Sequence, residues 1–145
     1  MIKWQDSFKV KVDIIDEQHQ RLFEIAEAAH ELLMLPSYTD RFDEIMQLAE
    51  ELKDYTKFHF AEEEKLMMKV KYNKLFSHKV MHQDFIEKMD SIDIYTVDEN
   101  QTQCLIDLVG FITEWITEHI LKTDKVLGEW YTQVHSDEID KGGIA

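Results

Sequence analysis

The sequence predicts an all-α protein, and three observations support this prediction. The chain of 145 residues contains four glycines and one proline, so residues that interrupt helices are scarce. Apolar residues recur at helical spacing through four long segments, at about residues 17–35, 40–70, 74–91 and 101–121. The connections between these segments are short, which favours an antiparallel, up-down-up-down four-helix bundle.

The parts of the chain follow in a simple order, and we expect a single domain over residues 1–145. Residues 1–15 alternate loosely between apolar and polar, which predicts an extended arm packed on the bundle. Asp16 resembles a helix N-cap, so the bundle is expected to occupy residues 16–122. Phe76 and Val80 are predicted to face inward from the third helix, and residues 97–100 to form a turn. A short C-terminal helix reaching about Val134 and a polar tail are expected within residues 123–145.

The composition limits the classes of partner and the location. The net charge of −14 repels phosphate backbones and anionic lipid, so we expect no nucleic-acid partner and no membrane partner. No apolar run is long enough to cross a bilayer, and the N-terminus lacks the apolar core of a signal peptide. The sequence therefore predicts a cytoplasmic protein, and such an acidic single domain is expected to be a monomer. Cys104, the one cysteine, is predicted to be a buried core thiol.

Five of the seven histidines fall at positions that could share one site. His59 and Glu63 are four residues apart, and so are His78 and His82. A step of four residues returns a side chain to nearly the same helix face. Each pair is therefore predicted to converge on one point inside the bundle.

The predicted topology brings these histidines to the same end of the molecule. His19 lies near the start of the first helix, and His59 lies toward the end of the second. His78 is near the start of the third, and His119 is at the end of the fourth. In an up-down bundle these four places meet at one end, which indicates a metal site assembled from all four helices. Imidazole with carboxylate suits iron, zinc, copper or nickel, and five imidazoles imply two ions, with Glu63 as a candidate bridge.

The sequence also resembles the hemerythrin family over about residues 4–130. The resemblance lies in four motifs in the family's order: Ile15–His19, His59–Glu64, His78–His82 and His119–Asp124. Trp4 in the arm and Trp115, one turn before His119, also fit. By its length the chain resembles a stand-alone bacterial member of this family.

The resemblance implies a cofactor of two non-haem iron ions with an oxo or hydroxo bridge. It assigns seven metal ligands. His78, His82 and His119 would hold one iron, and His19 and His59 would hold the other. Glu63 and Asp124 would bridge the two irons. The two-histidine iron then has one ligand fewer and is five-coordinate. O2 would bind there reversibly, as a hydroperoxide, for oxygen storage, delivery or sensing. The resemblance thus predicts an oxygen-binding protein rather than an enzyme, which would also bind small anions such as azide.

Two further predictions concern the surroundings of the site. Ile116, Ile120, Phe60 and Trp115 are candidate walls of an O2 pocket, and they are equally candidates for ordinary core positions. His119 and Asp124 are five residues apart, about 140° around a regular α-helix. The chain is therefore expected to tilt, end or become irregular at this point.

Three positions depart from the family's usual pattern, and none is a predicted ligand. Lys11 stands where glycine is common, Asn73 where proline is common and Leu127 where tyrosine is common. His30 is predicted to be a partly buried structural histidine and His135 an exposed one. Two other functions stay open: a diiron enzyme, such as a peroxidase or a nitric-oxide-reducing protein, and a sensory module that acts through a separate partner.

Overall fold

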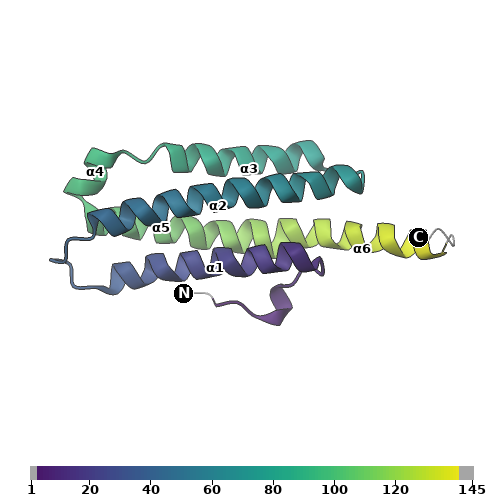
Figure 1. Ribbon diagram of the computed structural model, residues 1–145, viewed down its shortest axis with the longest axis horizontal. Helices are drawn as coiled ribbons and strands as arrows, with labels where there is room; N and C mark the ends of the chain where they lie inside the picture. The colour runs from purple at the N-terminus through teal and green to yellow at the C-terminus, as the bar shows by residue number, and fades with distance from the viewer. Residues whose placement is uncertain (1–2, 141–145) are drawn as a thin grey trace.

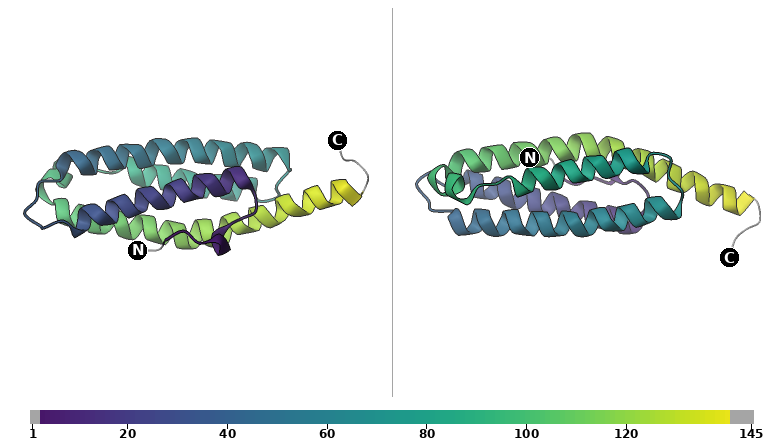
Figure 2. Two further views of the ribbon diagram at one scale, coloured as in Figure 1. Left: turned by 60° about the horizontal axis from the view of Figure 1, so that its bottom comes forward. Right: turned by 90° about the horizontal axis from the view of Figure 1, so that it is seen from above.

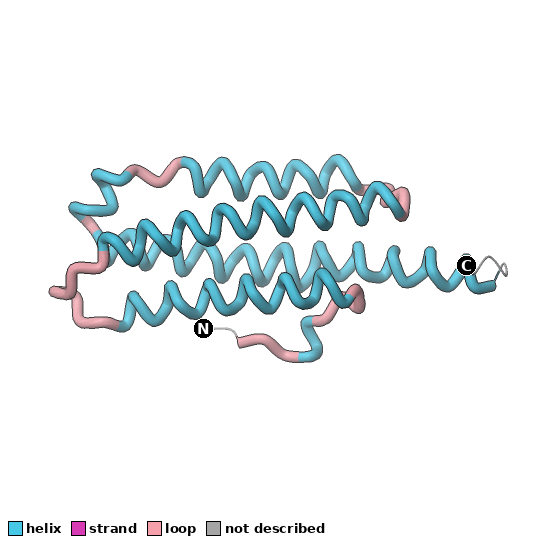
Figure 3. The backbone as a smooth tube through the Cα atoms, in the orientation of Figure 1, coloured by secondary structure: helices cyan, strands magenta, loops and turns pink. Residues whose placement is uncertain are grey.

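Every regular element in the described part of the chain is a helix, so the predicted all-α fold is confirmed. The computed structural model describes residues 3–140, and Figure 3 shows helices joined by loops throughout this range. The long helices are α1 (Asp13–Met34), α2 (Phe42–Lys69), α3 (Leu75–Asp90), α5 (Gln101–Trp115) and α6 (Asp124–Asp140). The short elements are the 3₁₀-helix η1 (Asp6–Phe8), α4 (Ile94–Glu99) and the π-helix η2 (Ile116–Thr123). No helix within residues 3–140 combines the length and the apolar character needed to cross a membrane.

The helices form a bundle of four long rods, because α5, η2 and α6 follow one another without a gap. In Figure 1, α1 and α3 run from right to left, whereas α2 and the α5–η2–α6 rod run from left to right. Figure 2 shows the end of α6 projecting beyond the other three rods. The C-terminal helix that the sequence predicts as a separate element is therefore the continuation of the fourth rod.

Apolar side chains from all four rods fill the core. Leu22 of α1, Leu52 of α2, Phe85 of α3 and Ile112 of α5 are each at most 3% exposed and belong to one cluster. Burying a side chain of this size contributes about 1.5–3 kcal/mol. The core occupies the length of the bundle and positions the helix faces that carry the histidines.

The predicted inward positions of Phe76 and Val80 are wrong. Phe76 is 80% exposed and Val80 is 59% exposed. The inward face of α3 is instead defined by His78, His82 and Phe85, which are buried. Residues 76 and 80 lie about 200° around the helix from residue 78, so they must point to the outside.

A short helix stands where the sequence predicts only a turn. Asp93 caps α4 by accepting a hydrogen bond from the backbone N–H of Tyr95 at 3.0 Å. Val97 of α4 is buried against Ile45 and other apolar residues, which holds this connection against the bundle. Cys104 beside this cluster is half-buried rather than buried, and burial raises the pKa of its thiol.

The N-terminal arm is fixed to the bundle by a buried carboxylate. The helix begins at Asp13, so Asp16 is not its N-cap. Asp16 instead lies inside the first turn and accepts hydrogen bonds from the N–H groups of Val10 at 2.7 Å and Lys11 at 3.2 Å. On the other side the arm lies against α6, where a Cβ at Gly128 would collide with the carbonyl oxygen of Val10.

The arm conformation explains why lysine at position 11 is unfavourable. The backbone φ of Lys11 is 68°, in the left-handed region that favours glycine. A side chain costs roughly 1–2 kcal/mol in this region. We therefore expect Lys11→Gly to raise the free energy of unfolding by about 1 kcal/mol, measured by urea denaturation. Lys9→Gly is the matched control, because the φ of Lys9 is −61° and glycine there should stabilise nothing.

Candidate metal centre

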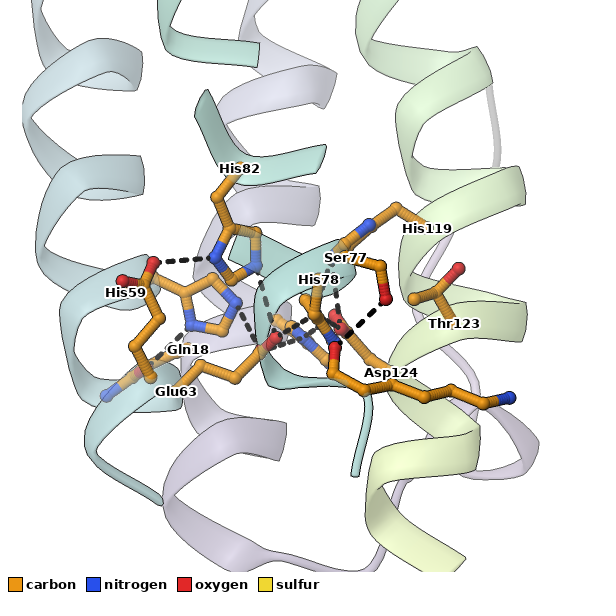
Figure 4. Close-up of polar contacts among 12 residues, drawn as sticks. Gln18, His59, Glu63, Ser77, His78, His82, His119, Thr123 and Asp124 are labelled. Atoms are coloured by element: carbon orange, nitrogen blue, oxygen red, sulfur yellow. Dashed lines mark hydrogen bonds and ion pairs between the residues drawn. The ribbon is translucent and has the colours of Figure 1, made fainter. Parts of the chain in front are cut away.

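All seven predicted ligands lie together in the interior of the bundle. They come from four rods: His19 from α1; His59 and Glu63 from α2; His78 and His82 from α3; His119 from η2 and Asp124 from the start of α6. Each of these residues is at most 4% exposed. Figure 4 shows the side chains of four histidines turned toward the two carboxylates. Their ligand atoms form two overlapping groups that share Glu63 and Asp124, and within each group all atoms lie within 4.8 Å of one another.

The π-helix η2 explains how residues five apart reach the same point. A π-helix pairs residue i with residue i+5, and the N–H of Asp124 donates to the carbonyl oxygen of His119 in this way. The side chains of these two residues therefore share a face, with Nε2 of His119 3.1 Å from Oδ1 of Asp124. The predicted helix irregularity is confirmed, and its form is the eight-residue π-helix η2.

The two oxygens of Glu63 face different histidines. Oε1 lies 2.7 Å from Nε2 of His78 and 3.3 Å from Nε2 of His82. Oε2 lies 3.1 Å from Nε2 of His59 and 3.8 Å from Nε2 of His19. The carboxylate thus stands between one pair of imidazoles and another.

The two oxygens of Asp124 also face different histidines. Oδ1 lies 3.0 Å from Nε2 of His78 and 3.1 Å from Nε2 of His119, and Oδ2 lies 3.0 Å from Nε2 of His19. Together the carboxylates separate three histidines on one side from two on the other. This is a geometry in which two metal ions could each contact one oxygen of both carboxylates.

The unpaired atoms of the site fit a pair of metal ions. Several buried ligand atoms have no hydrogen-bond partner outside the cluster: Nε2 of His19, His59 and His82, and both carboxylate oxygens of Glu63 and of Asp124. A buried polar atom without a partner costs about 1–3 kcal/mol. So many in one place are explained if the atoms bind cations, and nitrogen with oxygen donors suits iron, zinc, copper or nickel.

The carboxylates strongly bias the protonation of the metal-free site. Burial lowers the pKa of His19 and His78, but hydrogen bonds to Asp124 and Glu63 outweigh this and raise both pKa values to about 9. Burial lowers the pKa of His59. Burial would raise the pKa of Glu63, yet the neighbouring His59 and His19 hold it well below its usual range.

Two residues that support the site were not predicted from the sequence. Oε1 of Gln18 accepts a hydrogen bond from Nδ1 of His59 at 2.7 Å, and Oε2 of Glu64 accepts one from Nδ1 of His82 at 2.9 Å. These bonds leave Nε2 as the nitrogen that faces the cluster. Gln18 had a detectable signal, since it is a polar residue on the buried stripe of α1.

Loss of the Gln18 amide should loosen His59 without removing a ligand. We expect Gln18→Ala to weaken metal binding about 10–100-fold, because outer partners orient the imidazole and set its tautomer. Metal affinity would be measured by competition with a chelator. Gln83→Ala is the matched control, since Gln83 is exposed on α3 and its amide contacts only Glu87, at 3.4 Å. Equal affinity of the two variants would contradict the supporting role of Gln18.

The four predicted pocket residues belong to the main apolar core or pack against it. Ile116, Ile120 and Phe60 are buried, whereas Trp115 is half-buried. Phe60 stacks on His82 with ring centroids 3.9 Å apart, and Trp115 stacks on His119 at 4.1 Å. Both aromatic rings therefore lie on the three-histidine side, where they restrict the imidazole orientations.

The other two histidines lie outside the cluster. His30 is partly buried, as predicted. The prediction that His135 is exposed is wrong. It is partly buried, it stacks on Tyr131, and its Nδ1 lies 3.1 Å from the carbonyl oxygen of Tyr131.

Comparison with known proteins identifies the family. The sequence model described as "Hemerythrin HHE cation binding domain" matches residues 10–131, which include all seven clustered residues. This chain belongs to the hemerythrin family. A bacteriohemerythrin of Clostridium acetobutylicum is 42% identical over 125 residues, covering 86% of this chain and 97% of that protein. A bacteriohemerythrin of Pseudomonas aeruginosa is 30% identical over 83% of this chain and 75% of its own length. A myohemerythrin of Theromyzon tessulatum is 28% identical over 84% of this chain and 87% of its own length.

Family membership and geometry lead to the same function. Hemerythrins bind O2 at a centre of two iron ions, and this chain has the buried cluster of histidines and carboxylates that could hold them. The predicted oxygen-binding function and diiron cofactor are confirmed at this level. The role of each residue is a separate question.

Proposed function

We propose that the seven clustered residues are the ligands of the two irons and that the protein binds O2 reversibly without turnover. His78, His82 and His119 would hold one iron, His19 and His59 would hold the other, and Glu63 and Asp124 would contact both. The division of both carboxylates between three histidines and two carries this proposal. With one histidine fewer, the second iron keeps a position for O2.

The surroundings of the cluster favour binding over reaction. When bound, the two irons supply the electrons with which O2 is held. The protein supplies seven fixed ligands and an apolar enclosure, of which Ile116, Ile120 and Phe60 are buried walls. Such walls limit the entry of water and of protons, which keeps O2 from being reduced further. We propose O2 contact for Ile116, Ile120 and Phe60, whose ring centroid also lies 5.7 Å from that of His59. Trp115, which stacks on His119, would instead support the three-histidine side.

Iron analysis combined with absorption spectra tests this function. A freshly reconstituted sample should contain about two irons per chain and should give a stable oxygenated spectrum that disappears under vacuum. Azide should change the spectrum of the oxidised form. Fewer than two irons would count against the ligand set, and rapid bleaching with peroxide release or substrate turnover would show an enzyme instead. A cytoplasmic location and a monomeric state stay predictions from the sequence.

A further inference from the structure

The end of the bundle nearest the metal centre carries a basic surface on an otherwise acidic protein. Residues 65–80 comprise the end of α2, the connection and the start of α3, and they contain five lysines but no aspartate or glutamate. We call this segment the basic turn; its lysines are Lys65, Lys69, Lys71, Lys74 and Lys79. Five of the 16 basic residues lie here, which leaves 11 basic residues against 30 acidic ones in the rest of the chain. All five lysines are exposed.

Exposed apolar side chains lie among these lysines. Phe76 is 80% exposed, while Met68 and Val80 are each 59% exposed. Lys65 and Lys79 approach Glu62 and Glu64 at 3.8 Å and 3.9 Å, so part of their charge is balanced within the protein. Apolar residues bordered by charged ones are typical of an interface with another protein.

The basic turn also contains one of the candidate ligands. His78 belongs to it, and Phe76 and Val80 are each two residues from His78, on the outer face of the same helix. Tyr72 of the turn is buried with its ring centroid 6.3 Å from that of His78. A molecule seated on the basic turn would therefore lie one helix thickness from the three-histidine side of the centre.

We propose that the basic turn is the docking surface for a small acidic electron-carrier protein that returns the oxidised centre to its ferrous form. This inference rests on the proposed function, because only a redox-active pair of irons needs such a partner. If bound O2 left the centre as peroxide, both irons would remain ferric and could no longer bind O2. Two reduced carriers, each giving one electron, would return both irons to ferrous and would leave in the oxidised form.

Charge complementarity favours an acidic protein over other occupants. A second copy of this chain would have to place a different, acidic face on the basic turn, and such a pairing does not close into a dimer. A flat anionic membrane would also meet the acidic residues that border the turn, such as Glu62 and Glu129. A small acidic carrier can contact the lysines alone, and opposite charge would speed its association at low salt.

Binding measurements on the iron-loaded protein test the proposal. The probe is a plant-type [2Fe–2S] ferredoxin, an acidic one-electron carrier, at low ionic strength. We expect Lys69→Glu/Lys74→Glu to raise the dissociation constant at least 10-fold. Lys3→Glu/Lys88→Glu changes the net charge equally at exposed positions away from the turn, and it should change the constant less than 2-fold. Phe76→Ala should weaken binding a few-fold, whereas Tyr95→Ala, at an aromatic residue that is 79% exposed, should not.

The rate at which reduced ferredoxin reduces the diferric form should fall in parallel in the Lys69→Glu/Lys74→Glu variant. Reduction by dithionite, which needs no docking, should be unchanged. Equal effects of the two double variants, or no ferredoxin binding by the unmodified protein, would overturn the proposal. Binding to vesicles containing anionic lipid would be measured in the same way. If Lys69→Glu/Lys74→Glu weakened vesicle binding but not ferredoxin binding, the basic turn would be a membrane site and the proposal would be overturned. Because the dissociation constants do not depend on O2 binding, failure of the proposed function would be seen separately, in the iron content and the spectra.

Discussion

Glu63→Gln should reduce the iron content from about two ions per chain to fewer than one. The substitution keeps the size of the side chain but replaces a carboxylate oxygen by an amide nitrogen, which is not a metal ligand. One iron would lose its oxygen contact and the other would keep only a neutral amide oxygen, because Oε1 faces His78 and His82 whereas Oε2 faces His59 and His19. We expect the affinity for ferrous iron to fall ~100-fold or more. Loss of a direct ligand should cost at least as much affinity as loss of a residue that only hydrogen-bonds to a ligand. Iron content after gel filtration and the absorption spectrum would measure the effect.

The neighbouring carboxylate provides a control for this change. Glu62 lies one residue away on α2, and its charge contacts Lys65 at 3.8 Å on the outside of the bundle. Glu62→Gln should keep two irons and an unchanged spectrum. Full iron content in Glu63→Gln, or equal losses in both variants, would contradict the bridging role of Glu63.

Helix periodicity explains why the sequence was enough to predict that five histidines cluster with Glu63, whereas Asp124 was assigned by the family resemblance. His59 with Glu63 and His78 with His82 repeat at four residues, and regular helices turn such pairs to one face. The up-down order of the rods then brings the ends of α2 and α5–η2 beside the starts of α1 and α3. These are properties of single helices and of chain order, so they can be read without knowing any contact. The same reasoning exposed the mismatch at Asp124, where a regular helix fails and a π-helix is found.

Contacts between helices were not predictable in the same way. Glu64 is the partner of His82 only because α2 and α3 pack at one particular rotation, and no spacing within either helix encodes this. Phe76 is exposed for the same reason, because the rotation at which α3 packs on the bundle decides which of its faces is buried. An apolar residue indicates burial only on average, and the buried polar histidines took the inward face of α3. The conformation of Lys11 depends on the hydrogen bonds to Asp16, which lie outside any local rule.

Removal of the metal should destabilise the protein and make its stability depend on pH between about 6.5 and 9. Burying unpaired imidazoles and carboxylates costs free energy that iron binding offsets, so we expect Tm to fall by at least about 10 °C. In the metal-free protein, hydrogen bonds to Asp124 and Glu63 outweigh burial and raise the pKa of His19 and His78 from 6.5 to about 9. Their contribution to stability is fully present below pH 6.5 and is lost as the pH rises through about 9.

The carboxylates give the opposite dependence at lower pH. Burial opposes the ionisation of both carboxyls, and the charge of Glu63 also opposes that of Asp124, but the histidines hold both pKa values below the usual range. Their contribution is present above the unfolded carboxyl pKa and is lost at more acidic pH. The Tm of the metal-free protein should therefore be highest between about pH 4.5 and 6.5. In the iron-loaded protein the histidines are neutral ligands, so Tm should not fall between pH 6.5 and 9. A parallel fall with and without iron would mean that His19 and His78 do not exchange protons for metal, and would remove them from the ligand set.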